Sequence, residues 1–208
     1  MDDRKAKVVI GGLLHDIGKV VYRQGGDRRN HSISGYDYLK EETTVDDAEV
    51  LDCVRYHHAY LLKNAKIDEN SLAYIVYLAD NIAAFSDRRE KENAEEKGFE
   101  LSTPLQSVFN ILNGNHQEFY YQPGDMDPDG GINYPSAEKK MFSQEFYTKI
   151  RQRMTENLRG IDWSSEYVNS LLSVMEANLS YVPSSTSKAE LTDISLYDHV
   201  KFTAALAS

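Results

Sequence analysis

The chain has 208 residues with one cysteine, Cys53, and its 33 acidic and 23 basic side chains give a formal net charge of −10. A single cysteine excludes a disulfide scaffold and a multi-cysteine zinc site. No apolar run approaches the roughly 18 residues of a membrane span, and the acidic balance argues against a protein that coats nucleic acid through a general basic surface. No signal-peptide pattern precedes His15, so we expect a cytoplasmic protein without a membrane partner.

The first 90 residues are expected to form helices joined by short connections. Apolar positions at helical spacing predict a helix over 5–22, although Gly11, Gly12 and Gly18 lower its intrinsic helicity. Three further helices are expected, from 31 to 40, from 45 through the pair His57-His58, and from 71 to 85. Asp80 is embedded in the apolar face of the last of these.

The second half carries weaker signals. The mixed-charge run 87–97 is typical of a solvated helix end or a linker. Helices are expected over 104–112, 136–158, 164–181 and 193–208, with a strand within 118–122. The pattern predicts a mainly α protein, with room for a small β-hairpin near 118–134. The last helix has no terminating signal, which leaves open that the chain is part of a longer protein.

Metal-ligating residue types gather in the first half. The candidate ligands are His15 with Asp16, His31, His57 with His58, and Asp80. A carboxylate on an apolar helix face is costly to bury unless it is paired or bound to a metal. Imidazole and carboxylate together suit Mn, Fe, Co, Ni or Zn, so the pattern predicts helices that converge on a metal site in a bundle core. The remaining histidines, His116 and His199, are expected to be ordinary polar residues.

Two spacings refine this prediction. Neighbouring residues on a helix point about 100° apart, so His57 and His58 either serve two ions or divide into one ligand and one hydrogen-bonding residue. Lys19 lies one turn after His15 on the same side of the expected helix. Its ammonium group is placed to hold a phosphate.

The run Leu14-His-Asp-Ile-Gly-Lys19, followed by the candidate ligands at 31, 57, 58 and 80, resembles the HD superfamily of metal-dependent phosphohydrolases. Within it, the chain resembles the N-terminal HD nuclease domain of the large signature subunit of type III CRISPR interference complexes, subtype III-A. The stretches that carry this narrower resemblance are 11–19, 31–35, 78–84, 103–107 and 193–199.

The resemblance implies an HD helical bundle over 1–90 and a helical extension over 91–208 that ends near the junction with a palm domain. It also implies a metal-dependent nuclease for single-stranded DNA, with one or two divalent ions of Mn, Ni, Co or Fe. The implied partners are the palm domains of the same subunit and other subunits of the complex with their guide RNA.

Residue roles follow from this chemistry. Asp16 is the expected bridging carboxylate, and His15, His57 and Asp80 are the first expected ligands, with His31 and His58 next. Lys19 is expected to stabilise charge on the phosphate as a catalytic group beside His15 and Asp16. Arginines that follow Lys19 are expected to contact the phosphate backbone of the DNA strand; they are Arg23, Arg28 and Arg29. Either Tyr22 or Tyr56 is expected to stack on a base.

One departure and two rival interpretations stand beside this expectation. Many superfamily members carry a further histidine upstream of the His-Asp pair, whereas none precedes His15 here, and His31 is the expected substitute. The first rival is an HD phosphohydrolase that acts on nucleotides or cyclic nucleotides. The second is a non-catalytic scaffold module in which any bound ion is structural.

Overall fold

The computed structural model describes residues 3–27, 29–91, 97–112, 114, 117–126, 132–159 and 165–208. Over these ranges the chain contains helices and isolated β-bridges but no β-strand, which confirms the mainly α prediction. The helices are α1 (Asp3–Leu14), α2 (Gly18–Gln24), α3 (His31–Glu42), α4 (Ala48–Tyr56), α5 (Ala59–Leu62), α6 (Leu72–Asp87), α7 (Phe109–Leu112), α8 (Gln144–Asn157), α9 (Ser165–Leu179) and α10 (Leu196–Ala207). No helix in the described part of the chain is long and apolar enough to cross a membrane.

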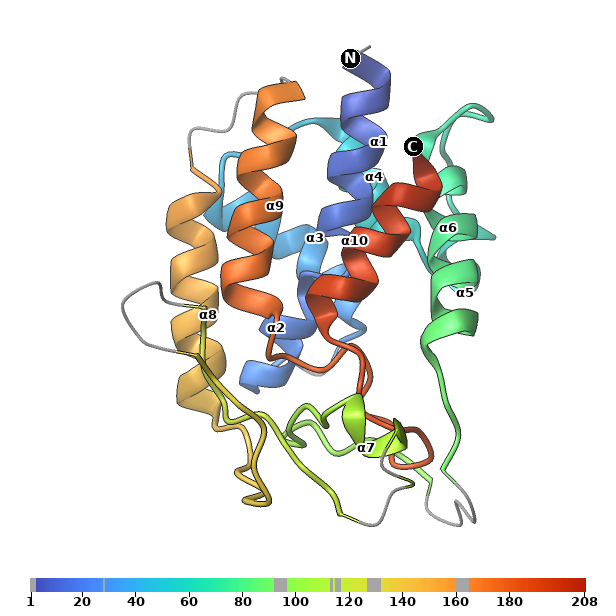
Figure 1. Cartoon of the computed structure of the whole chain (residues 1–208). Helices are drawn as coiled ribbons and strands as arrows, with labels where there is room; N and C mark the ends of the chain where they lie inside the picture. The colour runs from blue at the N-terminus through green and yellow to red at the C-terminus, as the bar shows by residue number, and fades with distance from the viewer. Residues whose placement is uncertain are drawn as a thin grey trace.

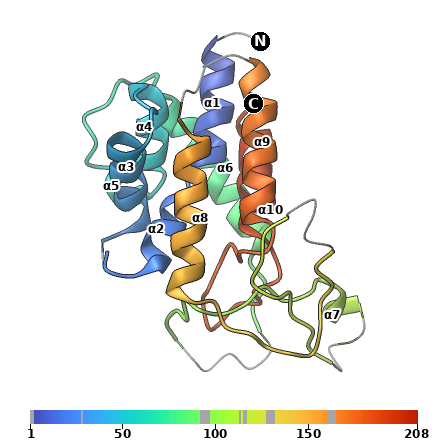
Figure 2. The ribbon, with the colours of Figure 1, turned by 90° about the vertical axis from the view of Figure 1, so that its left-hand side faces the viewer.

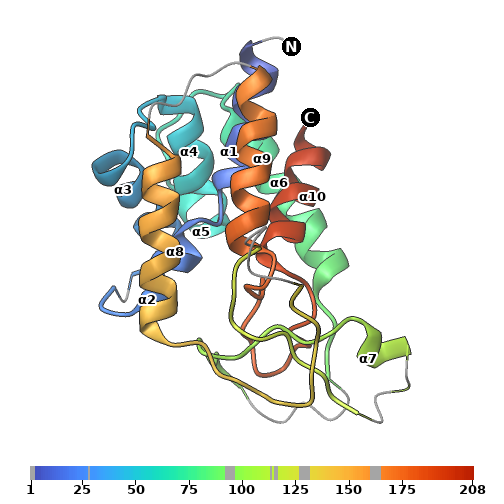
Figure 3. The same cartoon turned by 60° about the vertical axis from the view of Figure 1, so that its left-hand side comes forward.

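The helices form a bundle around α1, which packs against α4, α6, α9 and α10. Both ends of the chain lie at one end of the bundle, and the long connections with α7 lie at the other (Figure 1). Turned views place α8 and α9 side by side in front of α1 (Figures 2 and 3). One core joins the two halves of the sequence, since Leu14 and Leu39 share it with Met154, Leu171 and Val200.

The helix expected over 5–22 is broken at the His-Asp motif. α1 ends at Leu14, a short turn follows with Ile17 N donating to Leu14 O over 3.0 Å, and α2 then begins at Gly18. The break lets α2 pack closely on α3, because a Cβ at Gly18 would overlap the carbonyl of His31. Continuing the helix straight would carry Gly18 away from α3, so tertiary packing overrides the apolar pattern.

Gly12 gives α1 a similarly close neighbour at the other end of the sequence. A Cβ at Gly12 would lie 2.8 Å from the Cα of Ala204 in α10. The glycine that lowers the helicity of α1 therefore lets the last helix approach the first. This approach brings α10 alongside the His-Asp turn.

Elements of the second half are shorter than predicted. The helix expected over 136–158 begins only at Gln144, because Ser143 caps it by accepting from Phe146 N. The helix expected over 104–112 is reduced to α7. Residues 127–131 of the hairpin expected near 118–134 lie outside the described part of the chain, and within that part Tyr120 makes isolated bridges with Gln106 and Ser136. Pro135, beside this bridge, has no N–H to extend a ladder.

Candidate metal centre

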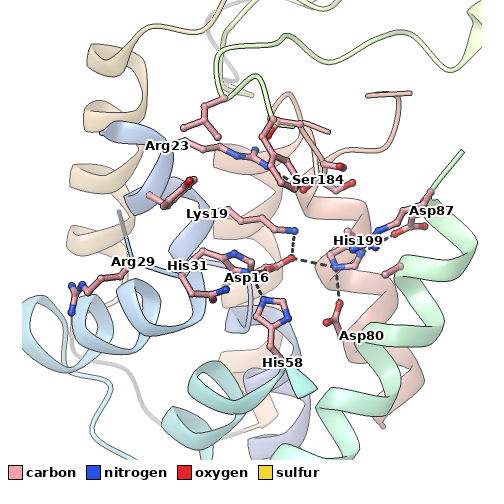
Figure 4. Close-up of a pocket in the computed structure, with 18 residues that line it drawn as sticks. Asp16, Lys19, Arg23, Arg29, His31, His58, Asp80, Asp87, Ser184 and His199 are labelled. Carbon is pink, nitrogen blue, oxygen red and sulfur yellow. Dashed lines mark hydrogen bonds and ion pairs between the residues drawn. The ribbon is translucent and has the colours of Figure 1, made fainter. Parts of the chain in front are cut away.

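The six predicted ligands lie close together, although they come from four parts of the chain. Four of them line a cavity of about 520 Å³, and the other two, His15 and His57, are buried beside it. His15 and Asp16 lie in the α1–α2 turn, His31 begins α3, His57 and His58 lie between α4 and α5, and Asp80 lies in α6. Figure 4 shows Asp16 at the centre of this group, with Lys19 pointing toward it from α2. Helix ends and turns thus supply most of the site.

The two neighbouring histidines do not share a helix, contrary to the prediction. α4 ends at Tyr56, and His58 has extended backbone angles (φ −108°, ψ 134°) at the start of α5. This kink turns both rings toward the same partner. The Nε2 atoms of His57 and His58 lie 3.2 Å and 3.0 Å from the Nε2 atom of His31.

Two backbone carbonyls orient the rings of His15 and His57. The Nδ1 atom of His15 lies 2.7 Å from Gly12 O, and the Nδ1 atom of His57 lies 2.7 Å from Val54 O. Because a carbonyl oxygen only accepts, each Nδ1 carries the proton and donates it. Each Nε2 of a neutral ring then presents a lone pair to the site, as in metal-binding histidines.

Asp16 separates the imidazoles into two sets. Its Oδ1 atom lies 3.0 Å from His31 Nε2 and 3.7 Å from His57 Nε2. Its Oδ2 atom lies 3.4 Å from His15 Nε2 and accepts from Lys19 Nζ over 2.5 Å. Burial alone would raise the pKa of Asp16, but Lys19 and His15 hold it well below its ordinary value. The carboxylate is therefore ionised. Its two oxygen atoms face different sets of imidazoles.

His199 of α10 is part of the site, and the expectation that it is an ordinary polar residue is wrong. Its Nε2 atom lies 3.3 Å from Asp16 Oδ2 and 3.2 Å from Asp80 Oδ1. Its Nδ1 atom lies 2.8 Å from Asp87 Oδ2. His199 thus reaches the site from the other end of the sequence. His116 lies outside the described residues.

Sequence signals for these two missed residues do exist. Asp87 follows Asp80 by seven residues, so both lie on one face of α6. His199 lies on the buried face of α10 between Leu196 and Val200. His199 shares with Asp80 the feature that predicted a ligand role for that aspartate, namely a polar side chain on an apolar helix face.

The ligand atoms fall into two groups, each with its atoms within 4.8 Å of one another. One group is His31, His57 and His58, and the other is His15, Asp80 and His199. The Nε2 atom of His15 is buried and makes no hydrogen bond among the described residues, and the carboxylate oxygens of Asp16 and Asp80 lie 3.4 Å and 3.5 Å from it. A buried nitrogen without a hydrogen bond is costly unless something else binds it. Nitrogen and carboxylate donors of this kind fit divalent metal ions.

The two groups differ in protonation. Burial and the neighbouring imidazoles lower the pKa of His57, and burial with His31 lowers the pKa of His58 to about 4. Burial also acts on His15, but Asp16 and Asp80 outweigh it and raise its pKa to about 9. The first group is therefore neutral at pH 7, whereas His15 holds a proton that a metal must displace.

The three arginines predicted to meet DNA have different environments. Arg23 is 6% exposed and donates to the carbonyls of Pro183 and Ser184, so it ties α2 to a distant loop. Arg29 pairs with Asp27 and Asp37, and Figure 4 shows it apart from the ligands. Arg28 lies outside the described residues.

Comparison with known proteins agrees with this geometry. Residues 1–84 match the family model described as HD domain. This matched part of the chain also holds most of the clustered histidines and aspartates that could bind a metal ion.

The chain is also similar to deoxyribonucleases of CRISPR systems. The chain is 36% identical, over 100% of its length, to the CRISPR system single-strand-specific deoxyribonuclease Cas10/Csm1 (subtype III-A) of Streptococcus thermophilus, of which it covers 28%. It is 34% identical over 100% of its length to the protein of that name from Mycobacterium tuberculosis, of which it covers 29%. These matches confirm the predicted resemblance, and the chain spans less than a third of each relative.

The fold gives the same result. The crystal structure of Csm1 in T. onnurineus superposes with a TM-score of 0.70 at 26% identity, covering 100% of this chain and 28% of that one. The helical architecture is therefore shared over the whole length of the chain.

Proposed function

We propose that this chain is the HD nuclease domain of a type III-A CRISPR large subunit and hydrolyses phosphodiester bonds of single-stranded DNA. The observation that carries the proposal is the position of Asp16 between two groups of metal ligands. Paired metal sites that share a carboxylate are typical of enzymes that displace groups at phosphorus. The activity that gives the Cas10/Csm1 relatives their name supports single-stranded DNA as the substrate.

In this proposal His31, His57 and His58 would hold one ion, and His15, Asp80 and His199 would hold a second. Asp16 faces both groups and would be available to either ion. Mn, Ni, Co and Fe are the proposed metals, because the donors are imidazoles and carboxylates without a thiolate. When bound, such ions supply Lewis acidity toward phosphate oxygens and lower the pKa of water.

The residues of the chain itself orient the reaction. His15, Asp16 and Lys19 are the proposed catalytic residues. Lys19 Nζ donates to Asp16 Oδ2 and also lines the cavity, so its charge is available to a phosphate beside that carboxylate. A fixed ammonium at this position stabilises negative charge that develops on the phosphate.

We also propose that residues 1–90 form the HD core and residues 91–208 extend the same domain. The remaining domains of the subunit and the other subunits, with their guide RNA, are the proposed partners. An exposed apolar surface on α6 and α10 supports such contacts. Its residues are Ile75, Leu78, Ile82, Phe85, Phe202 and Leu206.

The test is to incubate the chain and Mn²⁺ with single-stranded DNA, duplex DNA, mononucleotides and cyclic nucleotides. We expect cleavage of single-stranded DNA, and its loss in Asp16→Asn with an unchanged circular dichroism spectrum. Asp46→Asn, on the exposed surface, is the matched control and should retain activity. Cleavage of nucleotides alone would favour the phosphohydrolase rival, and metal binding without any cleavage would favour the scaffold rival.

A further inference from the structure

The cavity extends beyond the metal ligands to a wall of different chemistry. Apart from Asp16, Asp80 and Asp87, the described residues that line it include no carboxylate. The rest of the lining holds three arginines, two serines, a threonine and the aromatic side chains of Tyr22 and Phe99. Because Arg23 donates to backbone carbonyls and Arg29 pairs with two aspartates, Arg88 is the arginine that this wall offers to a ligand. In a chain with a net charge of −10, such a wall is a local exception that suits a phosphate-bearing ligand.

Phe99 is exposed but held in place. Its side chain is 72% exposed, although it lines the same cavity as Asp16 and Lys19. Its backbone pairs with Ser187 in an antiparallel bridge, in which Lys188 N donates to Gly98 O over 2.9 Å and Glu100 N donates to Thr186 O over 2.8 Å. A rigid backbone presents this aromatic ring to solvent beside the metal centre.

Arg88 adds a cation to the same wall. It caps the end of α6, with its backbone N–H donating to Ala84 O, so its position is set by the helix that carries Asp80 and Asp87. Its side chain is 63% exposed, and its Nε atom lies 3.9 Å from Glu190 Oε1. The guanidinium group is therefore placed at the cavity with most of its surface open to a ligand.

We propose that Phe99 and Arg88 form a nucleotide subsite beside the metal centre. Phe99 stacks on the base of a nucleotide next to the bond that is cut, and Arg88 pairs with a phosphate of the same strand. Aromatic stacking with cationic backbone contacts is the general way in which proteins bind single strands without reading their sequence. The inference rests on the proposed nuclease function and extends it to the recognition of the substrate.

The subsite also gives a reason for a preference for single strands. In a duplex, both faces of a base are covered by its neighbours, and its edge is paired. A base in a single strand offers a free face to Phe99. Stacking at this position therefore discriminates against duplex DNA without any contact to the edge of a base.

The experiment compares Phe99→Ala with the wild-type chain on two single-stranded probes, an oligothymidylate and the same oligomer with abasic sites throughout. We expect kcat/KM on oligothymidylate to fall about 30-fold, the middle of the range for loss of one stacking contact. On the abasic oligomer, which keeps the phosphates, we expect no change. Phe99→Trp should restore the activity on oligothymidylate.

Phe109→Ala is the matched control, since Phe109 is 57% exposed and is not among the cavity-lining residues. It should behave as wild type on both probes. Equal activity of Phe99→Ala and wild type on oligothymidylate, or an equal loss on both probes, would overturn the subsite.

Binding of the same probes, followed by fluorescence anisotropy without added metal, separates this inference from the proposed function. If the wild-type chain cleaves neither probe, the nuclease proposal fails. The subsite is then supported if wild type prefers oligothymidylate over the abasic oligomer and Phe99→Ala does not, and it is overturned if both proteins bind the probes alike.

Discussion

His199 and Asp87 are joined by a hydrogen bond of 2.8 Å between Nδ1 and Oδ2, at the point where α10 crosses the end of α6. The opposite nitrogen of the same ring faces Asp16 and Asp80. A carboxylate on one imidazole nitrogen fixes the tautomer and raises the basicity of the other. Asp87 is thus a positioning residue that acts through His199.

Replacing this carboxylate tests its role. Asp87→Asn should lower the affinity for Mn²⁺ by about 10- to 100-fold, the usual effect of losing such a partner. Isothermal titration calorimetry measures the affinity directly, with Asp46→Asn as an exposed control. An unchanged affinity in Asp87→Asn would show that His199 needs no such support.

The two ligand groups should lose metal independently. His199→Ala should reduce bound metal from two ions to one, because His15 and Asp80 alone leave that group short of a ligand. His58→Ala should also remove one ion, from the other group. Elemental analysis of the purified variants gives the metal content per chain. Loss of both ions in either variant would contradict two separate groups around Asp16.

Metal binding should depend on pH with a defined sign. Burial opposes a proton on His199, but Asp16, Asp80 and Asp87 raise its pKa to about 10, and the pKa of His15 is about 9. Both rings are therefore protonated at pH 7 in the metal-free chain, and a metal must displace these protons. Affinity should rise from pH 7 to pH 9, by about tenfold per unit for each proton displaced.

Calorimetry in buffers of different ionisation enthalpy counts the released protons. The His31 group should release none at pH 7, because burial lowers the pKa of His31, His57 and His58. An affinity that stays constant between pH 7 and pH 9 would contradict the protonation of His15 and His199.

The close contact of α2 with α3 should tolerate no added methyl group. In Gly18→Ala, the new Cβ would meet the carbonyl of His31 and lie 2.7 Å from Gly35 N, and backbone atoms cannot rotate away. We expect a loss of about 1–3 kcal/mol in the free energy of unfolding, together with weaker metal binding because His31 is displaced. Urea unfolding of the metal-free protein measures the first effect. A midpoint of urea unfolding in Gly18→Ala equal to that of the wild type would contradict the close packing of α2 on α3.

The sequence predicted those parts of the site that depend on local pattern. His15, Asp16 and Asp80 stood out because buried carboxylates and a nearby imidazole need a partner. The orientation of His57 and His58 was not predictable from helical periodicity, since it depends on the end of α4 at Tyr56. Helix spacing carries no information about where a chain kinks under tertiary contacts.

His199 could not be assigned from local pattern for a different reason. Its neighbours in the site, Asp16 and Asp80, lie more than a hundred residues earlier in the sequence. The packing of α10 on α1 and α6, including the close approach of Ala204 to Gly12, brings His199 to them. A histidine on a buried helix face carried the signal, but its partner was unknown until the helices were placed.

In the proposed nuclease, Asp16 would lie between two metal ions. Anomalous diffraction from crystals of the chain grown with Mn²⁺ tests this position most directly. We expect two anomalous peaks, one beside His31, His57 and His58 and one beside His15, Asp80 and His199, with one oxygen of Asp16 toward each. A single peak, or two peaks on the same side of Asp16, would contradict it.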